Sequence, residues 1–193
     1  ILYPLVLVPI GVLGAANAFN MIAGYNGLEA SMGLTLMLFT AIFSYVKGID
    51  LVFECSLIMA SALAVFLRFN WYPAKVFPGN TLTYAVGAYY ASLVILGNME
   101  KFGVLLYTLY FIEFILFIRG IKDGIYKENF GIPKNDGTLK QPYNKIYSLT
   151  HLAIVILEKS GIKPTEVKVT LTLTSLQILV GMIVLMTTLL SLI

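Results

Sequence analysis

Asparagine and glycine residues are concentrated in two short segments of an otherwise apolar chain. Residues 17–29 read Asn-Ala-Phe-Asn-Met-Ile-Ala-Gly-Tyr-Asn-Gly-Leu-Glu, and residues 70–81 read Asn-Trp-Tyr-Pro-Ala-Lys-Val-Phe-Pro-Gly-Asn-Thr. Amide carbonyl oxygens can bind a hard cation such as Mg²⁺, and backbone N–H groups near glycine can approach a nucleotide closely. Ordinary Asn/Gly turns have the same composition. The spacing alone therefore leaves a ligand site and a simple turn as alternatives.

The composition of the chain around these segments is that of a membrane protein. Of 193 residues, 59% are hydrophobic and 12% are charged, and the mean hydropathy is +0.86. The charged fraction is about half that of a soluble domain. The net charge is only +3. We expect the chain to lie in a lipid bilayer and not to bind a nucleic acid.

Hydrophobic runs predict an all-α fold, a polytopic transmembrane helix bundle that forms a single membrane domain over residues 1–193. About 20 apolar residues cross a bilayer as a helix, because every backbone polar group there must be paired internally. About six segments qualify as spans: residues 1–16, 28–46, 51–69, 81–97, 102–118 and 169–193. Glu113 falls in the fifth span, and we expect a buried partner for its carboxylate.

The loops between these spans divide into two sets with different charge. Residues 17–27, 68–80 and 119–168 lie on one face and carry eleven of the thirteen Lys and Arg residues; the turns 47–50 and 98–101 carry one lysine each. This asymmetry predicts that the larger loops are cytoplasmic. Within the loop 119–168, residues 147–157 are amphipathic and predict a helix lying at the membrane interface.

Both polar segments resemble the signature loops of the polyprenyl-phosphate N-acetylhexosamine-1-phosphate transferases. Residues 17–28 match the family pattern Asn-Ala-x-Asn-x-x-x-Gly-x-Asn-Gly-Leu along its whole length. Residues 70–81 are similar to the pattern Asn-Trp-Tyr-Pro-x-x-Val-Phe-x-Gly-Asp-Thr. That second pattern is typical of the archaeal and eukaryotic branch that makes dolichyl-diphosphate-GlcNAc. The resemblance covers nearly all of this chain but only the C-terminal half of the family.

The resemblance implies Mg²⁺ as the cofactor and two of its ligands. Asn20 matches a family residue that binds the metal, and Asn80 stands where the family usually has an aspartate. An amide still offers an oxygen but carries no charge, so we expect Asn80 to hold Mg²⁺ less tightly than an aspartate. No Asp-Asp pair occurs in the chain; the catalytic residues are therefore unknown, and the acidic pair on which the family relies is expected before Ile1.

The resemblance also implies contacts to a UDP-sugar. Asn26 and the backbone of Gly24 would hold the uracil, Phe77 would stack on it, and Lys75 would lie near phosphate. The family places a basic, histidine-containing cluster in the long loop, but residues 127–134 contain no histidine. The candidates for diphosphate contact there are Lys122, Lys127 and Lys134. We interpret His151 as a structural residue, because it lies outside this region.

These expectations describe an integral membrane enzyme with active-site loops in the cytoplasm. It would transfer GlcNAc-1-phosphate, or a related aminosugar phosphate, from a UDP-sugar to polyprenyl or dolichyl phosphate and release UMP. This would be the first step of lipid-linked oligosaccharide synthesis for protein glycosylation. The alternative is a non-catalytic membrane subunit or degenerate homologue that binds lipid phosphate or a partner. The membrane would be the plasma membrane in a prokaryote and the endoplasmic reticulum in a eukaryote, and the sequence leaves a homodimer open.

Overall fold

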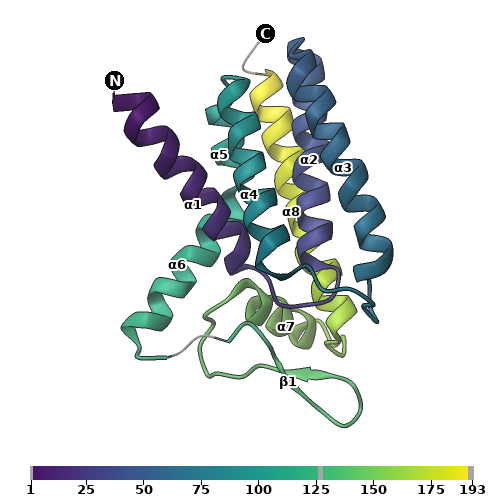
Figure 1. Cartoon of the computed structure of the whole chain (residues 1–193). Coiled ribbons are helices and arrows are strands. Elements are labelled where there is room, and N and C mark those ends of the chain that lie inside the picture. Colours follow the sequence, from purple (N-terminus) through teal and green to yellow (C-terminus); the bar gives the residue numbers. More distant parts are fainter. Residues whose placement is uncertain (1, 126–127, 191–193) are drawn as a thin grey trace.

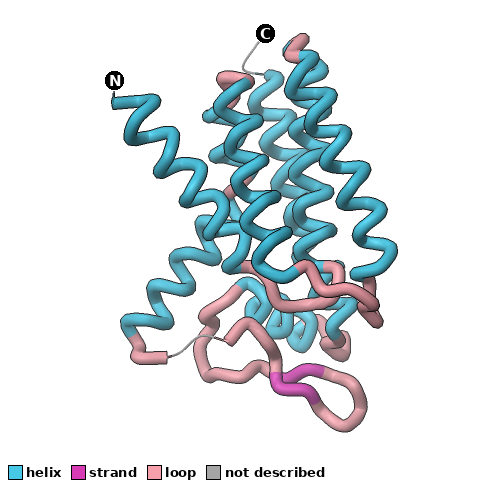
Figure 2. The backbone as a smooth tube through the Cα atoms, in the orientation of Figure 1, coloured by secondary structure: helices cyan, strands magenta, loops and turns pink. Residues whose placement is uncertain are grey.

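The computed structural model describes residues 2–125 and 128–190 as a bundle of helices with a small hairpin and a short helix at one end (Figures 1 and 2). A π-helical turn, η1, leads directly into α1. The elements are η1 (Tyr3–Leu7), α1 (Val8–Met21), α2 (Leu28–Lys47), α3 (Asp50–Asn70), α4 (Gly79–Leu96), α5 (Glu100–Leu106), α6 (Thr108–Lys122), β1 (Ile132–Pro133), β2 (Leu139–Lys140), α7 (Leu149–Lys159) and α8 (Glu166–Leu190).

The helices confirm the predicted all-α membrane bundle. Among the described residues, four helical runs are long and apolar enough to cross a membrane, namely residues 3–21, α2, α3 and α8, and the bent pair of α5 and α6 would make a fifth. Helix α4 has 18 residues and runs beside them, although its hydropathy is too low for it to count as a span by itself. In their described residues, the six predicted spans are helical over nearly their whole length, with a break in the fifth, and the two sets of loops lie at opposite ends of the bundle (Figure 1).

Helix boundaries differ from the prediction at both polar segments. Helix α1 continues to Met21, so Asn17 and Asn20 are helical and do not lie in a loop. The Asn17 side chain donates a hydrogen bond back to the Leu13 carbonyl at 2.8 Å, which keeps it compatible with the helix. Helix α4 likewise begins at Gly79, which places Asn80 in its first turn.

The predicted fifth span is broken. Helices α5 and α6 meet at Tyr107 with a bend of 56°. The Tyr110 N–H bonds to the Tyr107 carbonyl at 3.0 Å and so leaves the Leu106 carbonyl without its helical partner. Gln177 of α8 donates its side-chain N–H to that carbonyl at 3.0 Å. A buried carbonyl must find a donor, and Gln177 provides it.

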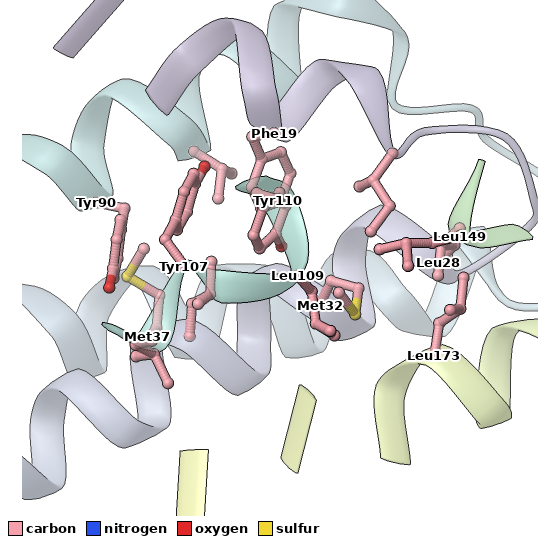
Figure 3. Packing of buried hydrophobic residues seen from close by; sticks show 14 of the residues in the cluster. Phe19, Leu28, Met32, Met37, Tyr90, Tyr107, Leu109, Tyr110, Leu149 and Leu173 are labelled. Carbon is pink, nitrogen blue, oxygen red and sulfur yellow. The ribbon is translucent and has the colours of Figure 1, made fainter. Parts of the chain in front are cut away.

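Aromatic rings fill the space around this break. The Tyr107 ring stacks on Tyr90 of α4 and on Tyr110 of α6, with centroids 5.0 and 4.1 Å apart, and Tyr110 stacks on Phe19 of α1 at 5.5 Å (Figure 3). The Tyr107 hydroxyl donates to the Ala15 carbonyl at 2.9 Å. These contacts connect α1, α4 and the bent pair across the middle of the bundle.

The polar end of the molecule is formed by the segment between α6 and α8. The predicted interfacial helix is present as α7, which begins after the N-cap Ser148. Strands β1 and β2, two residues each, form an antiparallel hairpin that the sequence did not predict. The expected partner of Glu113 is the start of α7: its carboxylate accepts from the Ser148 hydroxyl at 3.0 Å and from the Leu149 N–H at 2.7 Å.

Candidate functional site

The two polar segments meet through one buried side chain, that of Asn70. Its Oδ1 accepts the Gly27 N–H at 3.1 Å, and its Nδ2 donates to the Val76 carbonyl at 2.9 Å. Gly27 has a φ of +78°, and a Cβ there would lie 2.8 Å from the Trp71 ring. Both the backbone conformation and the close approach therefore require glycine. The two sequence motifs are therefore in direct contact in the folded chain.

Residues 22–27, which we call the hub loop, also bind the segment that precedes β1. Asn129 donates its side-chain N–H groups to the carbonyls of Met21 and Ala23, at 2.9 and 2.6 Å. The Gly131 N–H donates to the Tyr25 hydroxyl at 2.6 Å. A part of the chain more than a hundred residues away therefore holds the hub loop in position.

Two carboxylates accept hydrogen bonds from alternate amides of the hub loop. The Gly24 N–H donates to Glu29 Oε1 at 3.1 Å, and the Asn26 N–H donates to Glu166 Oε1 at 2.7 Å. Glu29 is only 5% exposed, and its second oxygen is buried with no hydrogen-bond partner. Backbone N–H groups that could have faced a ligand are thus already paired with side chains of this chain.

A cavity of about 670 Å³ opens beside the hub loop. Its walls combine aromatic rings, glycines and the two carboxylates, and Phe77, 73% exposed, projects from the wall into solvent. The lining residues are Ala23, Gly24, Tyr25, Asn26, Glu29, Asn70, Phe77, Pro78, Gly79, Phe130, Gly131, Pro133, Leu139 and Glu166. The structure therefore brings Gly24, Asn26 and Phe77, three of the residues singled out from the sequence, to one concave site.

The carboxylate of Glu166 gives this cavity negative charge. Burial raises the pKa of the Tyr25 hydroxyl, the Gly131 N–H that it accepts opposes this rise, and the negative charge of Glu166 adds to it. Tyr25 is consequently a neutral phenol at neutral pH. The described residues that line the cavity include two glutamates and no lysine or arginine.

Asn20, near the end of α1, and Asn80, in the first turn of α4, both lie beside Thr83. The Thr83 hydroxyl donates to Asn20 Oδ1 at 2.6 Å and lies 3.2 Å from the backbone carbonyl oxygen of Asn80. An amide oxygen has two lone pairs, so Asn20 can still offer one to a cation. These neutral oxygens fit part of the coordination shell of Mg²⁺, which commonly takes few protein ligands. Across residues 2–125 and 128–190, no three His, Cys, Asp or Glu side chains converge as a metal site.

Of the lysines proposed from the sequence, the three that the structure describes do not line the cavity. The Lys75 side chain is exposed, and its backbone N–H donates to Phe69 O at 2.8 Å. Lys122 ends α6, away from the hairpin, whereas Lys134 lies in the hairpin turn, where its N–H donates to Thr138 O at 2.8 Å (Figure 1). Lys127 lies outside the described residues. His151 is buried in α7, with its Nε2 2.9 Å from the Glu128 carbonyl oxygen, as expected of a structural residue.

Sequence reasoning missed four side chains that build this site, namely Glu29, Asn70, Asn129 and Glu166. Glu29 is the last residue of the first motif and Asn70 is the first residue of the second, so the motifs themselves contained this signal. Asn129 and Glu166 had no signal of their own, because their partners lie 106 to 140 residues away.

Comparison with known proteins identifies the family of this chain. The model of the family described as glycosyl transferase family 4 matches residues 1–98. A Sulfolobus acidocaldarius protein with the provisional name UDP-N-acetylglucosamine–dolichyl-phosphate N-acetylglucosaminephosphotransferase is 39% identical over 158 residues, which cover 81% of this chain and 47% of that protein. A Saccharolobus solfataricus protein of the same provisional name is 37% identical over 157 residues, 80% of this chain and 47% of that protein.

Other relatives match about half of the chain. A phospho-N-acetylmuramoyl-pentapeptide-transferase of Clostridium perfringens is 39% identical over 101 residues, 52% of this chain and 32% of that protein. The chain spans about half the length of the two relatives that cover about four fifths of it. The matched family model includes the hub loop, Asn70 and the start of α4, where the site is built. The chain belongs to glycosyl transferase family 4.

Proposed function

We propose that the protein formed by this chain transfers a sugar phosphate from a UDP-sugar to a polyprenyl phosphate. The finer assignment is GlcNAc-1-phosphate, or a related aminosugar phosphate, passing to dolichyl or another polyprenyl phosphate, with Mg²⁺ as cofactor and UMP as product. The observation that carries the proposal is the contact between Asn70 and the hub loop. It unites both polar motifs at one cavity in a chain of this family.

The reaction is a displacement at phosphorus. An oxygen of the lipid phosphate forms a bond to the sugar-bearing phosphorus, and the bond from that phosphorus to the bridging oxygen breaks. The electron pair leaves on UMP. Such reactions depend chiefly on positioning and on stabilisation of charge. When bound, Mg²⁺ would offset the negative charge that develops on the departing UMP.

The roles of this chain's residues follow from their positions. Asn20, oriented by the Thr83 hydroxyl, and Asn80 would hold part of the metal's coordination shell. The Asn26 side chain and Phe77 would bind the nucleoside in the cavity. Gly24, whose N–H is paired with Glu29, would let the base approach the backbone closely. The lipid phosphate would arrive through the membrane at the end of the bundle where the hub loop lies, which the charge distribution predicts to be cytoplasmic.

The test is UMP release by membranes that carry the chain, supplied with UDP-GlcNAc and a polyprenyl phosphate, with and without Mg²⁺. Because the chain spans about half of its relatives, a fusion behind the first half of the Sulfolobus acidocaldarius relative should be assayed in parallel. We expect the fusion to release UMP only when both Mg²⁺ and the lipid are present. A folded fusion that never releases UMP would refute the proposal.

A second candidate, a non-catalytic subunit that binds lipid phosphate, is favoured by one observation. The position at which the family usually has an aspartate carries Asn80, whose side chain has no negative charge to hold a metal ion. The same membranes distinguish the two: retention of radiolabelled polyprenyl phosphate without UMP release would favour the subunit.

A further inference from the structure

Glu166 lines the cavity beside the hub loop, and one of its two carboxylate oxygens is bonded to that loop. It lies in the first turn of α8, and its Oε1 accepts the Asn26 N–H at 2.7 Å. Over residues 2–125 and 128–190, no side chain or backbone group donates to its Oε2, and this oxygen is not among the buried unpaired atoms. Glu166 lines the cavity. One of its oxygens is therefore held by the protein, and the other is open to a ligand.

The charge and the aromatic rings of the cavity lining determine which kind of ligand group can bind to the open oxygen of Glu166. The carboxylate of Glu166 gives the wall negative charge, which repels a diphosphate, and the described lining residues include no lysine or arginine to offset it. Phe77 and Phe130 offer aromatic surfaces to a ligand. There is little room beside Gly24, because a Cβ at that position would lie only 3.2 Å from Asn129 Cβ. A neutral flat ring that carries an N–H donor satisfies all of these conditions.

We infer that Glu166 recognises the base of the uridine nucleotide, because its open oxygen accepts a hydrogen bond from the ring N3–H of uracil. This inference rests on the proposed function, which supplies the uridine nucleotide, and adds the residue that determines base specificity. Uracil offers a donor at N3 and cytosine an acceptor at the same position, whereas an ionised carboxylate can only accept. The Asn26 N–H fixes the orientation of the carboxylate, so Glu166 cannot turn its open oxygen away without losing that bond.

Glu166→Gln gives a sharp test, because it exchanges the open acceptor for a donor. The Asn26 N–H can only donate, so the glutamine oxygen must face it, and the NH₂ group must face the cavity. That NH₂ group would bind the cytosine N3 and meet the uracil N3–H donor to donor. We therefore expect the base preference to reverse and not merely to weaken.

The experiment is equilibrium binding of UMP, CMP and N3-methyl-UMP to the purified chain in detergent micelles. The wild type should bind UMP roughly 10- to 100-fold more tightly than CMP or N3-methyl-UMP, the range expected for a hydrogen bond to a charged group. Glu166→Gln should prefer CMP over UMP. The matched control is Glu158→Gln, an exposed glutamate at the end of α7, which should retain the wild-type ratios.

Each outcome bears on a different claim. Tight UMP binding with an unchanged UMP-to-CMP ratio in Glu166→Gln would overturn the inference and leave the proposed function intact. Equal binding of UMP and N3-methyl-UMP by the wild type would overturn it as well, even if the variant failed to fold. Absence of any UMP binding by folded wild-type protein would contradict the proposed function and the inference together.

Discussion

The Asn70 side-chain amide accepts the Gly27 N–H and donates to the Val76 carbonyl, and thereby joins the two polar motifs. The side chain is fully buried. Neither bond can be replaced by water without opening the site. This contact explains why two segments separated by two helices act as one unit.

Replacing Asn70 should therefore loosen both motifs at once. Asn70→Ala leaves the Gly27 N–H and the Val76 carbonyl without partners, and each buried group left unpaired costs about 1–3 kcal/mol. We expect a lower thermal unfolding temperature in detergent and faster hydrogen exchange across residues 22–27. Asn70→Asp keeps the acceptor and loses the donor, and exchange there should be slower than in Asn70→Ala. Equal exchange rates in wild type and Asn70→Ala would contradict the assigned role.

The packing of α1 on α4 depends on Gly87. A Cβ at this position would lie 2.6 Å from Ala15 O and 2.7 Å from Ala16 Cα, both backbone atoms that cannot move independently. Gly87→Ala should separate the two helices and destabilise the bundle by roughly 1–3 kcal/mol or more, the usual cost of overpacking.

The chain offers a matched control in Gly14, where an added Cβ meets nothing within 4 Å. Gly14→Ala should leave the unfolding temperature unchanged or raise it slightly, because alanine favours the helix. Comparable losses in Gly87→Ala and Gly14→Ala would show that general helix effects, not this contact, are responsible.

The break between α5 and α6 should depend on Gln177. Gln177→Leu removes the donor to the buried Leu106 carbonyl and should destabilise the protein by about 1–3 kcal/mol. Thr187→Val, on the exposed face of the same helix, loses only a bond to its own helix and should change stability by less than about 0.5 kcal/mol. Thermal unfolding in detergent compares the two, and equal shifts would refute the role of Gln177.

Asn80→Asp tests the proposed metal site in the direction of gained function. A carboxylate at the start of α4 adds charge to a neutral set of oxygens, so the Mg²⁺ concentration that supports half-maximal UMP release by the fusion should fall. Asn20→Ala should abolish Mg²⁺-dependent release. An unchanged Mg²⁺ requirement in Asn80→Asp would argue against a metal contact at this position.

The helices were predictable because lipid demands continuous internal hydrogen bonding, and hydropathy records that demand directly. The break at Tyr107 was not predictable, because its stability comes from Gln177 and Ala15, which hydropathy does not connect to it. Motif patterns indicated Gly24, Asn26 and Phe77, which share the cavity. They could not indicate Glu166, whose role depends only on where α8 begins relative to the hub loop.

The hydrogen-bond partners of the hub loop determine when the loop can reach its final conformation during synthesis. Its contacts come from Asn70, from residues 129–131 and from Glu166 and Thr170, the last of which donates to the Asn26 carbonyl at 3.3 Å. The ribosome makes residues 17–29 before any of these partners. The motif therefore acquires its final conformation only after much later parts of the chain are made. Until α8 is in place, residues 22–27 lack the hydrogen bonds to Glu166 and Thr170, and a chain stalled before Glu166 would carry the motif without the complete site.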